Sequence, residues 1–196
     1  MIKTFRSRDA ELLAARKSVP IFHAVEIAQA MEQVTRRKLA QLNAAEELGD
    51  LAVPSSNCLE STSFAGDQGH RIRVSYCWEL RFLWRRDAYD VDLVRRSRNP
   101  VLVRGKRENG LLPAIYPGEI LQDFMRPSLI GVTELAYATG LPKAQLTAVI
   151  SGQLEISADI AFRLGRFFHT TPSFWLNLQR DYEQQLAESA RLAAIG

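Results

Sequence analysis

A short run of side chains in the second half of the chain carries groups that can read the edges of DNA bases. Glutamine can pair bidentately with adenine, lysine can donate to O6 or N7 of guanine, and alanine methyl groups can contact the methyl group of thymine. The side chains that would read bases are Lys143, Ala144, Gln145, Thr147 and Ala148. Three neighbouring side chains suit contacts with phosphate oxygens instead: Thr133, Ser151 and Gln153.

These residues belong to a segment, 131–152, whose spacing predicts two helices joined by a tight turn. Ala136 is small where two helices approach closely, and Gly140, four residues later, can adopt the left-handed backbone conformation of the turn. Leu146, six residues further on, would seal the second helix onto the first, and Pro142 suits the first turn of that helix. An ordinary helical hairpin remains an alternative, but the spacing favours the helix-turn-helix that places its second helix in the major groove.

Further helices are predicted on both sides of this pair. Pro127 ends the helix before it, and Ser157 caps the helix after it. Thr171 followed by Pro172 is an N-cap followed by a first helical position, so a final helix is expected from 173 to about 194. Two aromatic side chains at its start are predicted to anchor the core: Phe174 and Trp175.

Two stretches of this half closely resemble the HigA family of antitoxins: residues 116–121 (Tyr-Pro-Gly-Glu-Ile-Leu) and 170–179 (Thr-Thr-Pro-Ser-Phe-Trp-Leu-Asn-Leu-Gln). The resemblance extends over residues 113 to about 186. It implies an all-α helix-turn-helix domain that forms two-fold homodimers, binds a palindromic double-stranded operator in its own promoter and neutralises a HigB toxin. Most relatives carry Ser-Arg where this chain has Pro142 and Lys143, so the operator sequence does not carry over.

Alternating side chains in the first half predict an antiparallel sheet with one buried face. Ile72, Leu80 and Phe82 occupy positions two or a multiple of two apart, and arginines fall between the apolar positions. Earlier in the chain, residues 25–45 have the apolar spacing of a long amphipathic helix, and residues 66–70 are turn-forming types expected in a loop. The first half is therefore predicted to be an α+β domain in which helices accompany an antiparallel meander.

Five side chains of this half are candidates for RNA cleavage: Arg73, Arg81, Arg95, Arg96 and His70. Cleavage through the 2′-hydroxyl needs a base, an acid and charge stabilisation of the phosphorane. The arginines could supply the charge and His70 the base. An arginine-bearing sheet face is also typical of solvated charge, and a lone histidine in a polar loop is typical of a residue without a catalytic role.

Residues 1–94 resemble a HigB toxin of the RelE superfamily. The matching stretches are, in order, residues 1–5, 57–61, 71–74, the strand of Trp78 and residues 87–91. The resemblance implies a compact helix-plus-sheet fold and ribosome-dependent cleavage of mRNA. Two departures predict that the activity is lost, because the family's arginine after the tryptophan is replaced by Glu79 and its closing Asp-Tyr-His by Arg95, Arg96 and Ser97.

Charge divides the 196-residue chain into two parts. Its formal net charge of +3 lies entirely in residues 1–99, whereas residues 100–196 carry as many acidic as basic side chains. The basic stretch between the two parts is interrupted by glycine and proline, which predicts a linker at residues 98–112. The predicted domains are therefore residues 1–97 and 113–196.

Composition limits the class of protein. With 46% hydrophobic and 24% charged residues the chain falls in the ordinary globular range. No apolar run approaches the roughly 20 residues of a membrane span, and the N-terminus has no secretory signal. We expect a cytoplasmic protein without membrane contact, metal or cofactor, in which Cys58 and Cys77 are reduced thiols.

A HigB-like half followed by a HigA-like half suggests a natural fusion of toxin and antitoxin. The resulting hypothesis is a sequence-specific DNA-binding repressor of its own promoter, with an inactive toxin domain. Its main alternative is a latent ribosome-dependent mRNA endonuclease, with ribosome or mRNA as partner, that is inhibited in cis by the antitoxin half. A third alternative is an interaction module that does not bind DNA, which would make the helix-turn-helix spacing a coincidence.

Overall fold

The chain forms two compact units in a computed structural model that describes residues 1–19, 28–75, 78–96 and 112–195. The first unit comprises Met1–Asn43 and Asn57–Pro113, and the second comprises Ala44–Ser56 and Ala114–Gly196. The backbone therefore passes from one unit to the other three times. Almost all of the predicted linker, 98–112, lies outside the described residues. The sequence did not predict that residues 44–56 would join the second unit.

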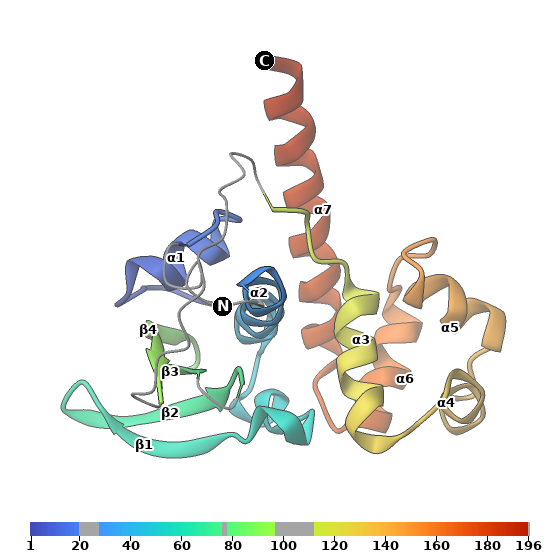
Figure 1. Cartoon of the computed structure of the whole chain (residues 1–196). Coiled ribbons are helices and arrows are strands. Elements are labelled where there is room, and N and C mark those ends of the chain that lie inside the picture. Colours follow the sequence, from blue (N-terminus) through green and yellow to red (C-terminus); the bar gives the residue numbers. More distant parts are fainter. Residues whose placement is uncertain (20–27, 76–77, 97–111, 196) are drawn as a thin grey trace. The chain divides into compact units, whose positions relative to one another are not determined.

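A four-stranded antiparallel sheet forms the framework of the first unit (Figure 1). Its strands are β1 (Glu60–Phe64), β2 (Asp67–Arg73), β3 (Trp78–Trp84) and β4 (Ala88–Arg95). They neighbour one another in sequence order, which confirms the predicted meander. The opening residues of the chain extend this sheet through isolated parallel bridges from Ile2 to Ala88 and from Phe5 to Val91.

One face of the sheet carries the core of the first unit. Ile72, Leu80 and Phe82 are fully buried, which confirms the predicted apolar alternation. Two helices accompany the sheet on one side, α1 (Arg8–Ala14) and α2 (Ala28–Ala44) (Figure 1). The described part of the predicted helix 25–45 is confirmed as α2, and α1 was not predicted.

The loop predicted at residues 66–70 is wrong except for its first residue. A two-residue turn, Ala65 (φ +56°) and Gly66 (φ +84°), joins β1 to β2, and β2 already begins at Asp67. Pairing with β1 and β3 holds the polar residues 67–70 in an extended conformation in spite of their turn propensity. Gly69 is required for close packing, because a Cβ there would lie 2.8 Å from Cβ of Phe64.

The second unit is helical. Its α-helices are α3 (Pro117–Met125), α4 (Val132–Thr139), α5 (Lys143–Ile150), α6 (Ala158–Phe168) and α7 (Pro172–Ile195). Short 3-10 helices occupy Leu48–Ala52, Arg126–Ser128 and Ser55–Asn57, the last of which ends at the first residue of the returning first unit. Both predicted N-caps are confirmed, because Ser157 Oγ accepts from Ile160 N at 3.4 Å and Thr171 Oγ1 accepts from Phe174 N at 3.2 Å.

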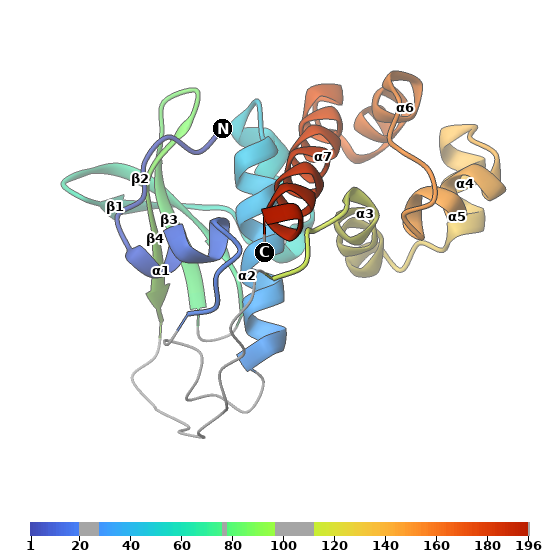
Figure 2. The same ribbon diagram turned by 90° about the horizontal axis from the view of Figure 1, so that it is seen from above.

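Aromatic side chains fill the core of this unit. Phe174 and Trp175, the predicted anchors, are fully buried. The ring of Phe124 on α3 lies 5.7 Å from that of Phe174 and 5.1 Å from that of Trp175, measured between centroids. Aromatic pairs at these separations add to the stability that burial of apolar area provides. The core therefore joins α3 to α7, and α4 and α5 lie side by side at the end of the unit away from α7 (Figure 2).

Close contact with α3 holds the C-terminal end of α5. A Cβ on Gly118 would collide with the carbonyl oxygen of Val149 and lie 2.8 Å from that of Ile150. The neighbouring Tyr116 hydroxyl donates to the same Ile150 oxygen. Burial raises the pKa of Tyr116, with a smaller contribution from the charge of Glu119, so the phenol stays protonated and can donate.

We predict that Gly118→Ala destabilises the second unit by about 1–3 kcal/mol, because backbone atoms must move to admit the methyl group. Thermal unfolding followed by circular dichroism measures the loss. The matched control is Gly49→Ala, since a Cβ on Gly49 meets nothing within 4 Å. Equal stability of the two variants would contradict the close packing of α3 on α5.

Candidate nucleic-acid interface

Helices α4 and α5 meet through a turn that only a few backbone conformations permit. Gly140, directly after α4, has φ +69° and ψ 17°, the left-handed region that glycine adopts without steric cost. Leu135, Leu146 and Val149 are each at most 1% exposed, so one face of each helix is fixed in the core. Pro142 is the N-cap of α5 and not, as predicted, a residue of its first turn. The observed pair has the helix-turn-helix form that the spacing predicted.

Burial of one side of α5 leaves the opposite side for a partner. Lys143, Ala144 and Thr147 are exposed, whereas Gln145 and Ala148 are half-buried. The exposed positions follow the spacing of one helix face, and Ser151 continues it after the helix ends. All five predicted base-reading residues thus lie on α5, and three of them are exposed.

The predicted phosphate contacts lie at the margins of this face. Thr133 is exposed in the first turn of α4, and Ser151 and Gln153 are exposed after α5. Tyr137, 93% exposed and one helical turn after Thr133, shares the same side of α4 and offers a hydroxyl. The sequence analysis missed Tyr137, although its i, i+4 relation to Thr133 was a usable signal.

Arg163 on α6, a second residue that the sequence analysis missed, supports the turn between α4 and α5. Arg163 Nη1 donates to the carbonyl oxygens of Thr139 at 3.2 Å and Gly140 at 3.5 Å. Its Nε donates to both carboxylate oxygens of Asp159 at 3.0 Å, which orients the guanidinium group. The i, i+4 pair could be read from the sequence, but the contact with the turn depends on how α6 packs against α4.

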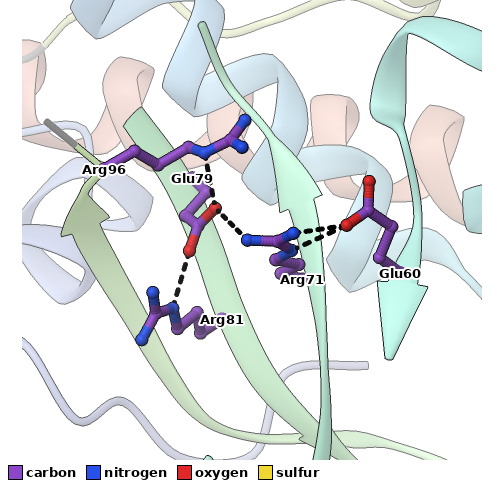
Figure 3. Close-up of polar contacts among 5 residues, drawn as sticks. All are labelled: Glu60, Arg71, Glu79, Arg81 and Arg96. Carbon is purple, nitrogen blue, oxygen red and sulfur yellow. Dashed lines mark hydrogen bonds and ion pairs between the residues drawn. The ribbon is translucent and has the colours of Figure 1, made fainter. Parts of the chain in front are cut away.

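A second cluster of charged side chains lies on the sheet of the first unit (Figure 3). Glu79 is buried, with its side chain only 2% exposed. Its Oε1 lies 2.7 Å from Nε of Arg81, and its Oε2 lies 3.3 Å from Nη1 of Arg71 and 3.2 Å from Nε of Arg96. Arg71 also pairs with Glu60 on the neighbouring strand, and this hydrogen bond lowers the pKa of Glu60 and raises that of Arg71. We call these five residues the arginine–glutamate cluster.

The cluster contains two of the five candidate catalytic residues, Arg81 and Arg96. Arg73 is exposed on the same face, opposite Glu79 in the strand register. Arg95 is opposite Trp78 at the end of β4. His70 pairs with Phe82, and their ring centroids are 6.0 Å apart, so His70 lies in a row of the core-bearing face.

Arg71 and Arg81 are paired across the strands and lie on one face of the sheet. His70 precedes Arg71 in β2 and therefore lies on the opposite face, because consecutive residues of a strand point to opposite faces. His70 is therefore not placed to act as a base beside Arg81. His70 is two positions before Ile72, and this spacing in the sequence indicated that both side chains lie on the core-bearing face. The loop predicted at 66–70 obscured it.

Other features bear on the class of site. No helix of the described residues combines the length and apolarity of a membrane span. Within the same residues, no group of three or more metal-ligating side chains comes together. Cys58 is a half-buried thiol, and Cys77 lies outside the described ranges.

Comparison with known proteins finds relatives for one part of the chain. Virulence-associated protein I of Dichelobacter nodosus is 36% identical over 85 residues, which are 43% of this chain and 76% of that protein. The HTH-type transcriptional regulator YbaQ of Escherichia coli K12 is 36% identical over 64 residues, which are 32% of this chain and 57% of YbaQ. No protein-family model matches the chain.

Among solved structures, the antitoxin HigA of Pseudomonas aeruginosa with the higBA promoter is 40% identical and covers 42% of this chain and 90% of HigA, with a TM-score of 0.40. An antidote protein of the HigA family from Coxiella burnetii is 38% identical and covers 43% of this chain and 92% of that protein, also with a TM-score of 0.40. These two solved structures are described as HigA proteins, and YbaQ is described as a helix-turn-helix regulator. Through about two fifths of its length, the chain belongs to the family of virulence-associated protein I.

Burial lowers the pKa of His70 below its usual value of 6.5. Because the folded chain then binds this proton less readily than the unfolded chain, His70 makes the first unit lose stability as pH falls below about 6.5. We predict that His70→Gln reduces this loss, which chemical denaturation at pH 7.5 and pH 5.5 would measure. The same decrease in both proteins would contradict the placement of His70 on the core-bearing face.

Proposed function

We propose that this protein is a transcriptional repressor that binds a palindromic operator in its own promoter through α4 and α5. The observation that carries the proposal is the division of α5 into a buried side, with Leu146 and Val149, and an exposed side, with Lys143 and Thr147. Such a helix can enter the major groove while its apolar side holds it on the domain. Its exposed groups can donate to bases and contact thymine methyls.

The relatives support the same class of function. YbaQ, 36% identical over its matched part, is described as a helix-turn-helix transcriptional regulator. A regulator of this class distinguishes its site by contacts with base edges, and its phosphate contacts fix the orientation of the domain. Thr133, Tyr137 and Ser151, exposed around α5, would make the phosphate contacts here.

The proposed repressor acts as a homodimer through the second unit. One recognition helix contacts too few base pairs for useful specificity, and two related by a two-fold axis read half-sites whose centres are about 10 bp, or a multiple of that, apart. Sequencing of DNA fragments retained by the purified protein would identify the operator, and light scattering would give the number of chains bound. A monomer on an asymmetric site would overturn the dimeric arrangement.

The charges of the two units suggest how affinity is distributed. α5 carries one cationic side chain, Lys143, and Glu134 is exposed in the first turn of α4. The second unit therefore offers few cationic groups for sequence-independent attraction to DNA phosphates. That attraction must come from these few groups, from helix N-termini, or from the excess of basic side chains in residues 1–99.

We predict that Gln145→Ala and Lys143→Ala each weaken operator binding by about 1–3 kcal/mol if they contact bases, with a smaller effect on random DNA. Fluorescence anisotropy with both DNAs at one salt concentration would measure the change. Gln184→Ala is the matched control, because Gln184 is an exposed glutamine on α7. An equal loss on operator and random DNA would remove Gln145 from the base-reading set.

For the first unit we propose an inactive HigB-like toxin domain. Its support is the arginine–glutamate cluster, in which a buried carboxylate engages three guanidinium groups that could otherwise bind a phosphate. A negative charge at such a position raises the free energy of an anionic transition state. Arg95, Arg96 and Ser97 stand in place of the family's closing Asp-Tyr-His, so the stacking tyrosine and the proton-transferring histidine have no counterpart.

The second candidate function is a latent mRNA endonuclease that the HigA-like part inhibits in cis. The observation in its favour is the same convergence of Arg71, Arg81 and Arg96 on one point of the sheet. If inhibition depended on a folded second unit, unfolding that unit would release the activity. The inactive-domain proposal expects no release.

We predict that Trp175→Ala, which removes a fully buried side chain at a cost of about 3–5 kcal/mol, unfolds the second unit without arresting growth of cells that express the chain. Reporter mRNA extracted from these cells should remain uncut. Growth arrest that disappears when Arg81→Ala is added would overturn the inactive domain and establish the latent endonuclease.

A further inference from the structure

Residues Ala44–Ser56, which we call the inserted segment, come from the middle of the first half of the chain but belong to the second unit. The backbone leaves the first unit after Asn43 and returns to it at Asn57. Ala44, Ala45 and Leu51 are each at most 2% exposed. The inserted segment is therefore an integral part of the second unit.

The principal contact of the inserted segment is made by Asp50. Its carboxylate is buried and lies at the start of α7, where Oδ1 accepts from Thr171 N at 2.6 Å and Oδ2 accepts from Thr171 Oγ1 at 2.9 Å. Thr171 is the N-cap of α7, so the Asp50 carboxylate bonds to the residue that begins the helix. A carboxylate is stabilised there by charge-assisted hydrogen bonds and by the positive end of the helix dipole.

Further hydrogen bonds shape the inserted segment around this carboxylate. Asp50 Oδ2 also accepts from the backbone N–H groups of Glu46 at 2.9 Å and Glu47 at 3.1 Å. One turn into α7, Asn177 Nδ2 donates to the carbonyl oxygen of Ala44 at 3.0 Å. Donors from the inserted segment and from the start of α7 thus satisfy the buried Asp50 carboxylate. Removal of Asp50 or of its donors would leave buried polar groups without hydrogen bonds.

We infer that the N-terminal end of α7 is a binding site for the inserted segment, so that residues 44–56 form a permanent internal ligand of the second unit. The chemistry recognised is a short acidic segment with an aspartate at the helix start. One consequence is that a cut in the connector between residues 96 and 112 does not release the second unit. The inference goes beyond the proposed function and does not depend on it.

The test uses the full chain with a site-specific protease recognition sequence in place of residues 100–106. After complete cleavage, native size-exclusion chromatography at decreasing concentration shows whether the fragments remain together. We expect the two fragments to co-elute at micromolar concentration and to separate in denaturant. Separation of the cut wild-type fragments at micromolar concentration would overturn the inference.

Variants of the inserted segment distinguish this site from any other contact between the fragments. Asp50→Ala with Asn177→Ala should raise the concentration at which the fragments separate by about 10- to 100-fold, because hydrogen bonds to a buried charge are lost. Asp50→Asn keeps the shape, loses the charge and should have an intermediate effect. Glu46→Ala is the matched control, since Glu46 is an exposed acidic residue of the same segment whose backbone N–H is retained.

Unchanged association in the Asp50→Ala, Asn177→Ala variant would overturn the inference, because other contacts would then hold the fragments. Circular dichroism of the uncut variant confirms that it folds, and Asp50→Asn provides the comparison if it does not. Operator binding by the uncut chain is measured separately. Loss of that binding would contradict the proposed repressor without affecting the inserted segment.

Discussion

The surface proposed to read DNA depends on the turn that joins α4 to α5. Gly140 allows the chain to reverse direction, and Arg163 donates to the turn's carbonyl oxygens from α6. Gly118 and Tyr116 hold the other end of α5 through the oxygens of its last residues. With both ends of α5 fixed and one side buried, the position of its exposed side chains is determined by the packing of the whole unit. A specific reader of bases needs such rigidity, because base-edge hydrogen bonds depend on direction.

In the first unit, the central feature is a cluster of charged side chains on the sheet. The arginine–glutamate cluster places a buried carboxylate among three guanidinium groups, each about 30% exposed. A buried ion pair of this kind contributes little net stability, but loss of one partner is costly because it leaves a charge without compensation. Glu79 thus couples the fold of the sheet to the neutralisation of its arginines. In the proposed inactive toxin domain, the same carboxylate makes this face a poor phosphate-binding surface.

Much of this architecture follows from local sequence patterns. Apolar side chains at every second position predicted the strands around Ile72 and Leu80, because successive side chains of a strand point to opposite faces and only one face of this sheet carries the core. Ser157 and Thr171 marked the starts of two helices, since their side chains satisfy backbone N–H groups that have no partner within the helix. The spacing from Ala136 through Gly140 to Leu146 identified the helix pair and hence the accessible side of α5. In each case the physical cause lies within a few residues of its effect.

Contacts between residues far apart in sequence were decided only by the tertiary structure. Residues 67–70 are strand because β1 and β3 pair with them, and this pairing placed His70 opposite Phe82, away from the arginines. Glu79, read in the sequence only as a reversed charge, became the centre of an ion cluster because β2 and the end of β4 brought Arg71 and Arg96 beside it. Asp50 met Thr171 across 121 positions. Periodicity carries no information about such partners, because each contact exists only after separate elements have packed together.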